Sequence, residues 1–122
     1  MKRDMDLVRT IILSLEAMPD AELNVTELTL EGHDDGVILE HLILLQEAGF
    51  IDMNVERFGA APPQFLVHRI TWEGHEFLET VRSDTIWAKS TKFITSAGLG
   101  LALPLLQAVL RAKAAEHLGI QI

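Results

Sequence analysis

Residues 34–56 read DDGVILEHLILLQEAGFIDMNVE, and this stretch decides the fold. Its first half predicts a helix, because three apolar residues recur on one helical face: Ile38, Leu42 and Leu45. Asp34 or Asp35 can cap the start of that helix, and Gly49 suits the left-handed residue that follows its end near Ala48. The second half, residues 51–56, alternates apolar and polar residues, which is typical of a strand with one exposed face.

Upstream of this stretch the pattern predicts another helix and a short strand. Asp4 or Asp6 can cap the helix, which ends near Met18 because Pro19 disfavours helical geometry for the residue before it. The alternating, β-branched run Val25–Leu30 then predicts a short strand.

Downstream, the strand over residues 51–56 has a partner. The sequence GAAPP at residues 59–63 breaks the strand, and Phe65–Ile70 returns beside it. The order helix, short strand, helix and β-hairpin is that of a reduced winged helix. We therefore predict an α+β fold, with a winged-helix-like domain over residues 1–84 and the Gly/Pro segment as the tip of its wing.

Three further helices are expected after the hairpin. Thr71 can cap a helix that runs through Arg82, and the chain can restart into a fourth helix at Asp84. Pro104 suits the first turn of a last helix that ends at Gly119. We expect residues 85–122 to form a C-terminal helical extension that packs on residues 1–84 or mediates dimerisation, within one structural domain overall.

The charge of the chain is acidic and unevenly distributed. The formal net charge is −8, and the absence of cysteine removes disulfides and thiolate metal sites. Residues 1–84 carry seventeen acidic and six basic side chains, whereas residues 85–122 carry one acidic and four basic side chains. The charged N-terminus runs straight into the first helix with no apolar signal segment, so we expect a cytoplasmic protein.

This charge argues against the usual role of a winged helix, which reads the major groove of DNA. Between Thr10 and Glu56 there is no Lys or Arg, while eleven Asp and Glu occur. A DNA reader needs cations for phosphate and donors for base edges, and an acidic helix repels the phosphates. DNA binding stays open as an alternative, because five basic side chains could converge in the fold: Lys2, Arg3, Arg9, Arg57 and Arg69.

Two apolar surfaces predict contacts with a partner. On a helical wheel, Ile43 and Leu44 fall on either side of a ridge formed by Glu40 and Glu47, so we expect the last helix or a second copy to cover them. The last helix adds four candidate interface residues: Leu105, Leu106, Val109 and Leu110. We expect a homodimer, with a basic protein partner docking on the acid-rich stretch Glu16–Glu56.

The uncharged run Phe93–Leu110 reaches the length of a membrane span but does not read as one. Gly98, Gly100 and Pro104 interrupt it, and the apolar helical part from about Leu103 is too short to cross a bilayer. We expect burial against protein and no membrane contact.

No catalytic residue, cofactor site or metal site is predicted. The second His of a zinc-protease helix is missing after His75, and phosphate-loop and nucleophile-elbow patterns are absent. A helical His such as His41 more often hydrogen-bonds in a core than binds metal. Glu73, Glu76 and Glu79 predict a solvated helix face, and both Trp72 and Trp87 are expected in the core.

Three blocks in order resemble a known family: Met1–Leu13, His41–Ile51, and Ile70–Leu78 with Arg82 and Trp87 after it. The chain looks like a member of the bacterial and phage family catalogued as domain of unknown function 2513, over most of residues 1–90. The resemblance implies a winged-helix-like domain, often found in prophage settings, with no established activity. It therefore brings no catalytic residues to this chain.

Two functions follow as hypotheses. The first is a non-enzymatic regulatory or interaction protein, dimeric, that binds a protein partner through an acidic surface. The second is a winged-helix transcriptional regulator that grips DNA with the wing and N-terminal cations. A DNA reader must bind duplex with an affinity that falls steeply as salt rises, whereas an acidic interaction module should not be retained on heparin.

Overall fold

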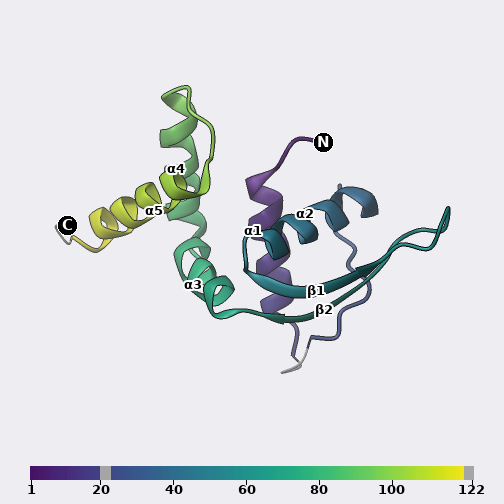
Figure 1. The fold of residues 1–122 in the computed structure, drawn as a ribbon. Coiled ribbons are helices and arrows are strands. Elements are labelled where there is room, and N and C mark those ends of the chain that lie inside the picture. The colour runs from purple at the N-terminus through teal and green to yellow at the C-terminus, as the bar shows by residue number, and fades with distance from the viewer. Residues whose placement is uncertain (20–22, 120–122) are drawn as a thin grey trace. The chain divides into compact units, whose positions relative to one another are not determined.

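The computed structural model describes residues 1–19 and 23–119, and it confirms the expected α+β class. The chain forms two compact units, Met1–Phe77 (unit 1) and Leu78–Ile122 (unit 2), with the boundary inside a helix. Figure 1 labels the elements of the described residues: α1 (Met5–Glu16), α2 (Asp35–Glu47), β1 (Ile51–Glu56), β2 (Gln64–Ile70), α3 (Trp72–Val81), α4 (Asp84–Ser96) and α5 (Leu103–Leu118).

Helix α1 starts at the predicted aspartate. The Asp4 carboxylate accepts hydrogen bonds from the backbone N–H groups of Asp6 and Leu7, at 3.0 and 3.2 Å. These bonds satisfy two of the amides that a helix start leaves without partners. The helix buries one face, made of Met5, Leu7, Val8, Ile11, Ile12 and Leu15.

A buried histidine ties α2 to the start of α1. His41 is fully buried, and its Nε2 accepts a hydrogen bond from the backbone N–H of Asp4 at 2.9 Å. Its Nδ1 lies 2.8 Å from the carbonyl oxygen of Val37, and a carbonyl can only accept, so Nδ1 carries the proton. The ring is therefore neutral, and the prediction of a hydrogen-bonded core histidine is confirmed at this position.

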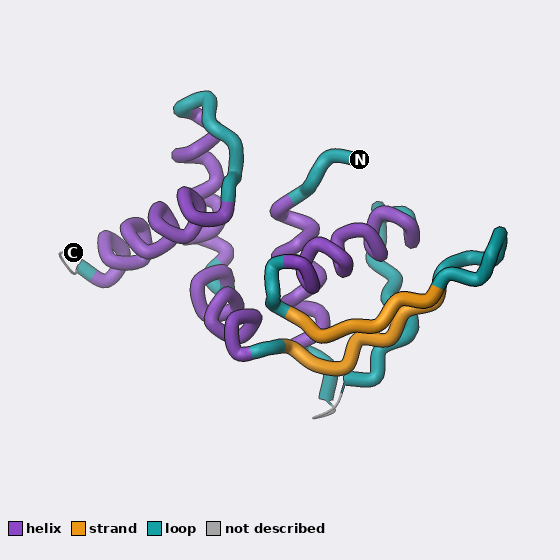
Figure 2. The backbone as a smooth tube through the Cα atoms, viewed as in Figure 1, coloured by secondary structure: helices purple, strands orange, loops and turns teal. Residues whose placement is uncertain are grey.

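The segment between α1 and α2 departs from the expected strand over Val25–Leu30. Only Val25 pairs, in an antiparallel bridge to Val67, with N···O distances of 3.1 and 2.8 Å in the two directions. Figure 2 shows the described chain beyond Val25 as loop up to α2. The prediction of a six-residue strand was wrong, because alternation marks a segment as suited to a strand but does not supply a partner for it.

The hairpin β1–β2 forms as predicted and is antiparallel. Its register runs from Ile51 opposite Ile70 to Glu56 opposite Gln64, with an irregularity between Asp52 and Met53. The apolar residues Ile51, Met53, Val67 and Ile70 are buried, so one face of the hairpin belongs to the core of unit 1.

The end of α2, the start of β1 and the start of α3 meet at one junction. The Thr71 hydroxyl donates to the carbonyl oxygen of Gly49 and accepts from the Gly74 N–H at 3.1 Å, so Thr71 caps α3 as predicted. The Thr71 N–H donates to the Phe50 carbonyl at 3.0 Å. The rings of Phe50 and Phe77 stack with their centroids 4.6 Å apart.

One expected core residue of this region lies outside. Trp72, the first residue of α3, is 75% exposed, whereas Trp87 in α4 is buried as predicted. The prediction for Trp72 was wrong because size and apolarity alone placed it inside. The burial of Phe77 and Leu78 determines which face of α3 points into the core. Trp72, at the first position of the helix, lies on a different face and is therefore exposed.

Unit 2 contains the end of α3 and the helix pair α4 and α5. Helix α4 starts at Asp84 as predicted, and Ser83 caps it, with its Oγ accepting from the Ile86 N–H at 3.2 Å. Pro104 lies in the first turn of α5, and Gly119 ends the helix in a left-handed conformation, both as predicted. The buried residues of the two helices are Trp87, Ser90, Ile94, Leu106, Leu110 and Ala115.

None of the helices in the described residues combines the length and the apolar character that crossing a bilayer requires.

Replacing Gly74 by alanine is expected to destabilise the protein strongly. A Cβ atom at this position would stand 2.1 Å from the Phe50 carbonyl oxygen and 2.6 Å from Ile70 Cγ2, so backbone must move to admit it. We expect Gly74→Ala to lower the free energy of unfolding by about 2 kcal/mol or more. Urea unfolding followed by circular dichroism measures this loss.

Gly36 provides the matched control for that substitution. It is also a helical glycine, and a Cβ there would meet nothing within 4 Å. Gly36→Ala should leave stability unchanged or raise it by up to about 1 kcal/mol, because alanine restricts the unfolded chain. Equal losses in the two variants would contradict the close approach of α3 to Phe50.

Candidate functional site

The exposed side of α2 carries acids flanked by apolar side chains. Glu40 and Glu47 are exposed, and Ile43 and Leu44 beside them are half-buried. We call these four residues the outer face of α2. The opposite face, Ile38, Leu42 and Leu45, is at most 1% exposed. The predicted ridge of two glutamates between two apolar residues is confirmed.

The two arginines at the hairpin are paired with carboxylates of the same unit. Arg57 Nη2 lies 3.9 Å from Glu40 Oε1, and Arg69 Nε lies 2.6 Å from Asp52 Oδ2. All four side chains are well exposed, so each pair contributes only about 0–1 kcal/mol to stability. Their larger effect is on the surface potential, because each guanidinium has a carboxylate beside it that offsets its attraction for a polyanion.

The N-terminal cations stand apart from those of the hairpin. Lys2 and Arg3 are exposed in the segment before α1, and Arg9 is half-buried within α1. The start of α1 lies away from the β1–β2 hairpin (Figure 1). The five cations weighed for DNA contact are therefore spread over two separate parts of unit 1.

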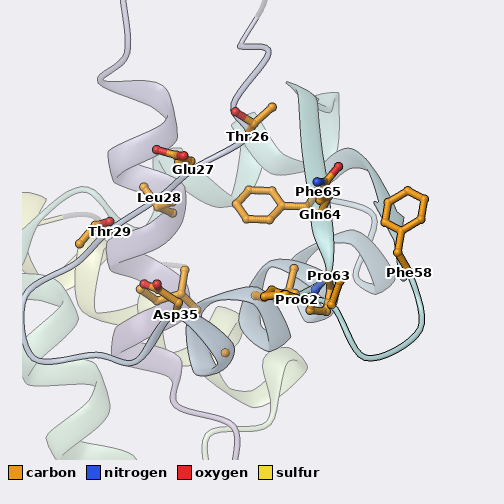
Figure 3. Close-up of a pocket in the computed structure, with 14 residues that line it drawn as sticks. Thr26, Glu27, Leu28, Thr29, Asp35, Phe58, Pro62, Pro63, Gln64 and Phe65 are labelled. Atoms are coloured by element: carbon orange, nitrogen blue, oxygen red, sulfur yellow. The ribbon is translucent and has the colours of Figure 1, made fainter.

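A groove opens between residues 26–29, the start of α2 and the hairpin loop (Figure 3). Its volume is about 970 Å³, and two carboxylates, Glu27 and Asp35, line it. The described residues that line it include no Lys, Arg or His. Most of the lining is apolar: Leu28, Ile38, Leu39, Phe58, Ala61, Pro62, Pro63 and Phe65.

The sequence did not reveal this groove. The short strand predicted over Val25–Leu30 gave no indication that the chain diverges from β2 here. Pro62 and Pro63 were the available signal, because proline has no backbone N–H and cannot donate to a ladder.

In unit 2 the four predicted interface residues divide into two pairs. Leu106 and Leu110 are at most 1% exposed in the single chain, so they belong to its core. Leu105 is 36% exposed and Val109 is half-buried, on the other side of α5. Two exposed alanines at helical spacing, Ala108 and Ala112, extend this side without charge as far as Ala112, and the exposed Glu116 follows on the same side.

The titratable residues do not gather into a metal centre. Over residues 1–19 and 23–119, no group of three or more His, Asp or Glu is placed to hold a metal ion. His41 is enclosed with its two backbone partners, and His75 lies exposed on α3. Glu73, Glu76 and Glu79 are exposed, as the predicted solvated face requires, and Glu79 pairs with Arg82 at 3.0 Å.

Comparison with known proteins identifies a family and one relative. Residues 2–100 match the family described as "Hypothetical protein (DUF2513)". An uncharacterized protein of Haemophilus influenzae is 33% identical over 109 residues, which cover 89% of this chain and 92% of that protein. No solved structure matches the chain.

The two neighbouring leucines of α2 test which face is outside. Leu45 is 1% exposed and Leu44 is half-buried, although the side chains are the same. We expect Leu45→Ala to cost about 2–5 kcal/mol of unfolding free energy, because it leaves a cavity in the core. Leu44→Ala should cost about 1 kcal/mol, because less of its area leaves water on folding. Chemical denaturation of both variants decides the point, and equal costs would refute the assignment of the outer face.

Proposed function

We propose that this chain, which belongs to the family described as "Hypothetical protein (DUF2513)", is a non-enzymatic, winged-helix-like interaction protein that binds a protein partner through the outer face of α2. The partner surface is basic with apolar side chains among its cations. The protein acts as a homodimer and serves a regulatory role.

The order of elements in unit 1 supports the winged-helix part of the proposal. Helix α1, the bridge at Val25, helix α2 and the β1–β2 hairpin follow one another as in a reduced winged helix. In that architecture α2 takes the position of the reading helix and residues 57–63 form the tip of the wing.

The observation that carries the proposal is the charge of the surface that such a helix would turn toward DNA. The outer face of α2 presents Glu40 and Glu47, and Glu40 also holds the nearby Arg57 in an ion pair. Phosphate contacts supply most of the sequence-independent affinity of DNA-binding proteins. An acidic surface cannot make these phosphate contacts and instead attracts positively charged groups.

The half-buried Ile43 and Leu44 support a protein partner over a small cation. Protein interfaces have an apolar centre and a polar rim, and the outer face of α2 has both elements. A basic helix or strand with apolar residues between its cations would satisfy the acids and cover the two apolar side chains.

The surface of α5 supports the homodimer. Leu105 and Val109 lie with the exposed Ala108 and Ala112 on one side of the helix, which carries no charge up to Ala112. An uncharged, partly exposed helix side of this kind is a candidate contact surface in a soluble protein.

Charge reversal at the two hairpin arginines tests the protein-binding proposal against DNA binding. The wild-type chain should not be retained on heparin, nor bind a labelled 20-base-pair duplex, at about 0.15 M salt. Reversing Arg57 and Arg69 to glutamate should change nothing, because both are already offset by carboxylates. Tight, salt-sensitive duplex binding that the double Arg variant abolishes would instead establish the DNA-binding alternative.

The same surface is tested from the partner side. Proteins captured from the native host by the wild-type chain should be lost with Glu40→Lys/Glu47→Lys. They should be retained with Glu73→Lys/Glu76→Lys, which reverses two exposed carboxylates on α3. Capture that both double variants retain would place the binding surface elsewhere.

The homodimer is tested by one substitution on each side of α5. We expect Leu105→Asp to reduce the mass measured by light scattering from that of two chains to that of one, because a charge would be buried in the interface. Leu118→Asp is the matched control, since Leu118 is 69% exposed and points away from the Leu105 face. A single-chain mass for the wild type would end the dimer proposal.

A further inference from the structure

We infer that the groove beside residues 26–29 binds an extended, basic and apolar segment of a partner protein by strand addition. The inference rests on the proposed function only in that the partner is a protein. It adds a second surface, distinct from the outer face of α2, and a chemistry for the segment that occupies it.

The first support is a run of backbone without partners. Val25 is paired to Val67, but Thr26, Glu27, Leu28 and Thr29 make no backbone hydrogen bond within the described residues. The run is nearly straight and follows one side of the groove (Figure 3). An unpaired, extended backbone edge is the template on which peptides add as strands.

The second support is that β2 cannot itself pair with residues 26–29. The register of Val25 opposite Val67 would continue with Glu27 opposite Phe65 and Thr29 opposite Pro63. Pro63 has no N–H to donate. The Phe65 ring projects from β2 toward the run of residues 26–29 (Figure 3). The two segments therefore diverge and leave a groove where a ladder would close.

The third support is that residues 26–29 belong to a segment suited to a strand. Thr26 and Thr29 are β-branched, as is Val25 before them, and β-branched residues favour strand geometry. The segment therefore needs a pairing partner rather than a change of conformation. A bound peptide supplies that partner.

The side chains that line the groove select the peptide. Phe65, Leu28 and the two prolines offer apolar contact, and Glu27 and Asp35 are the charged groups of the lining. With no cation among the described lining residues, an acidic peptide would be repelled. An extended segment in which Lys or Arg alternates with apolar residues satisfies both conditions, because alternate side chains of a strand point to opposite sides.

The experiment uses a fluorescein-labelled, acetylated hexapeptide of alternating lysine and valine and the full chain. Fluorescence anisotropy should show saturable binding. The same peptide with glutamate in place of lysine should bind at least about tenfold more weakly. A third peptide with every second backbone nitrogen methylated keeps its charges but loses donors on one edge, and it should also bind about tenfold more weakly.

Variants of the chain locate the site. Thr26→Pro and Thr29→Pro each remove one backbone N–H, and in an extended run these two groups point to opposite sides. We expect one variant to weaken binding about tenfold and the other to leave it unchanged. Glu27→Lys should weaken binding, and Glu73→Lys, an exposed carboxylate outside the groove, should not.

The outcomes separate this inference from the proposed function. Equal binding of the methylated and unmethylated peptides would overturn strand addition while leaving an acidic, protein-binding surface in place. Binding unchanged by either proline variant would overturn the assignment to residues 26–29. If no peptide binds and the duplex does, both proposals fail. Self-association that displaces the peptide would assign the groove to a second copy and overturn the inference.

Discussion

The contact on which unit 1 depends is the approach of α3 to the backbone of Phe50. Only the missing Cβ of Gly74 permits it, and the Thr71 hydroxyl bonds both the end of α2 and the first turn of α3 at the same place. Because Gly49 and Phe50 join α2 to β1, this junction fixes the direction in which the hairpin leaves the helix. The orientation of the outer face of α2 relative to the hairpin follows from it.

That orientation explains why acids and arginines meet on one surface. Glu40 projects from α2 far enough toward the hairpin to reach Arg57, and Asp52 pairs with Arg69 across the two strands. The pairs do little for stability, since all four side chains remain exposed to water. Each pair instead lowers the positive potential around its guanidinium, because a carboxylate stands beside it.

The groove lies where pairing between β2 and the segment after Val25 stops. Beyond Val25 the chain stays extended without joining β2. The prolines of the hairpin loop come directly before β2, and the Phe65 ring projects from β2 toward the run of residues 26–29 (Figure 3). The backbone groups along the run make no backbone hydrogen bond within the described residues, so they are open to an outside partner. An edge of this kind is a liability in most proteins, and the flanking carboxylates of Glu27 and Asp35 restrict which strands can approach.

The sequence by itself determined the local features. Apolar spacing located the buried face of α2, and caps and breakers such as Asp4, Gly49 and Pro104 located helix ends, because these signals act within a few residues. The tertiary structure alone decided that Trp72 lies outside, that the run after Val25 has no ladder and that Leu106 is core. Each of these features depends on which residues of a distant segment pack against or pair with the position. The periodicity of one segment contains no information about those residues.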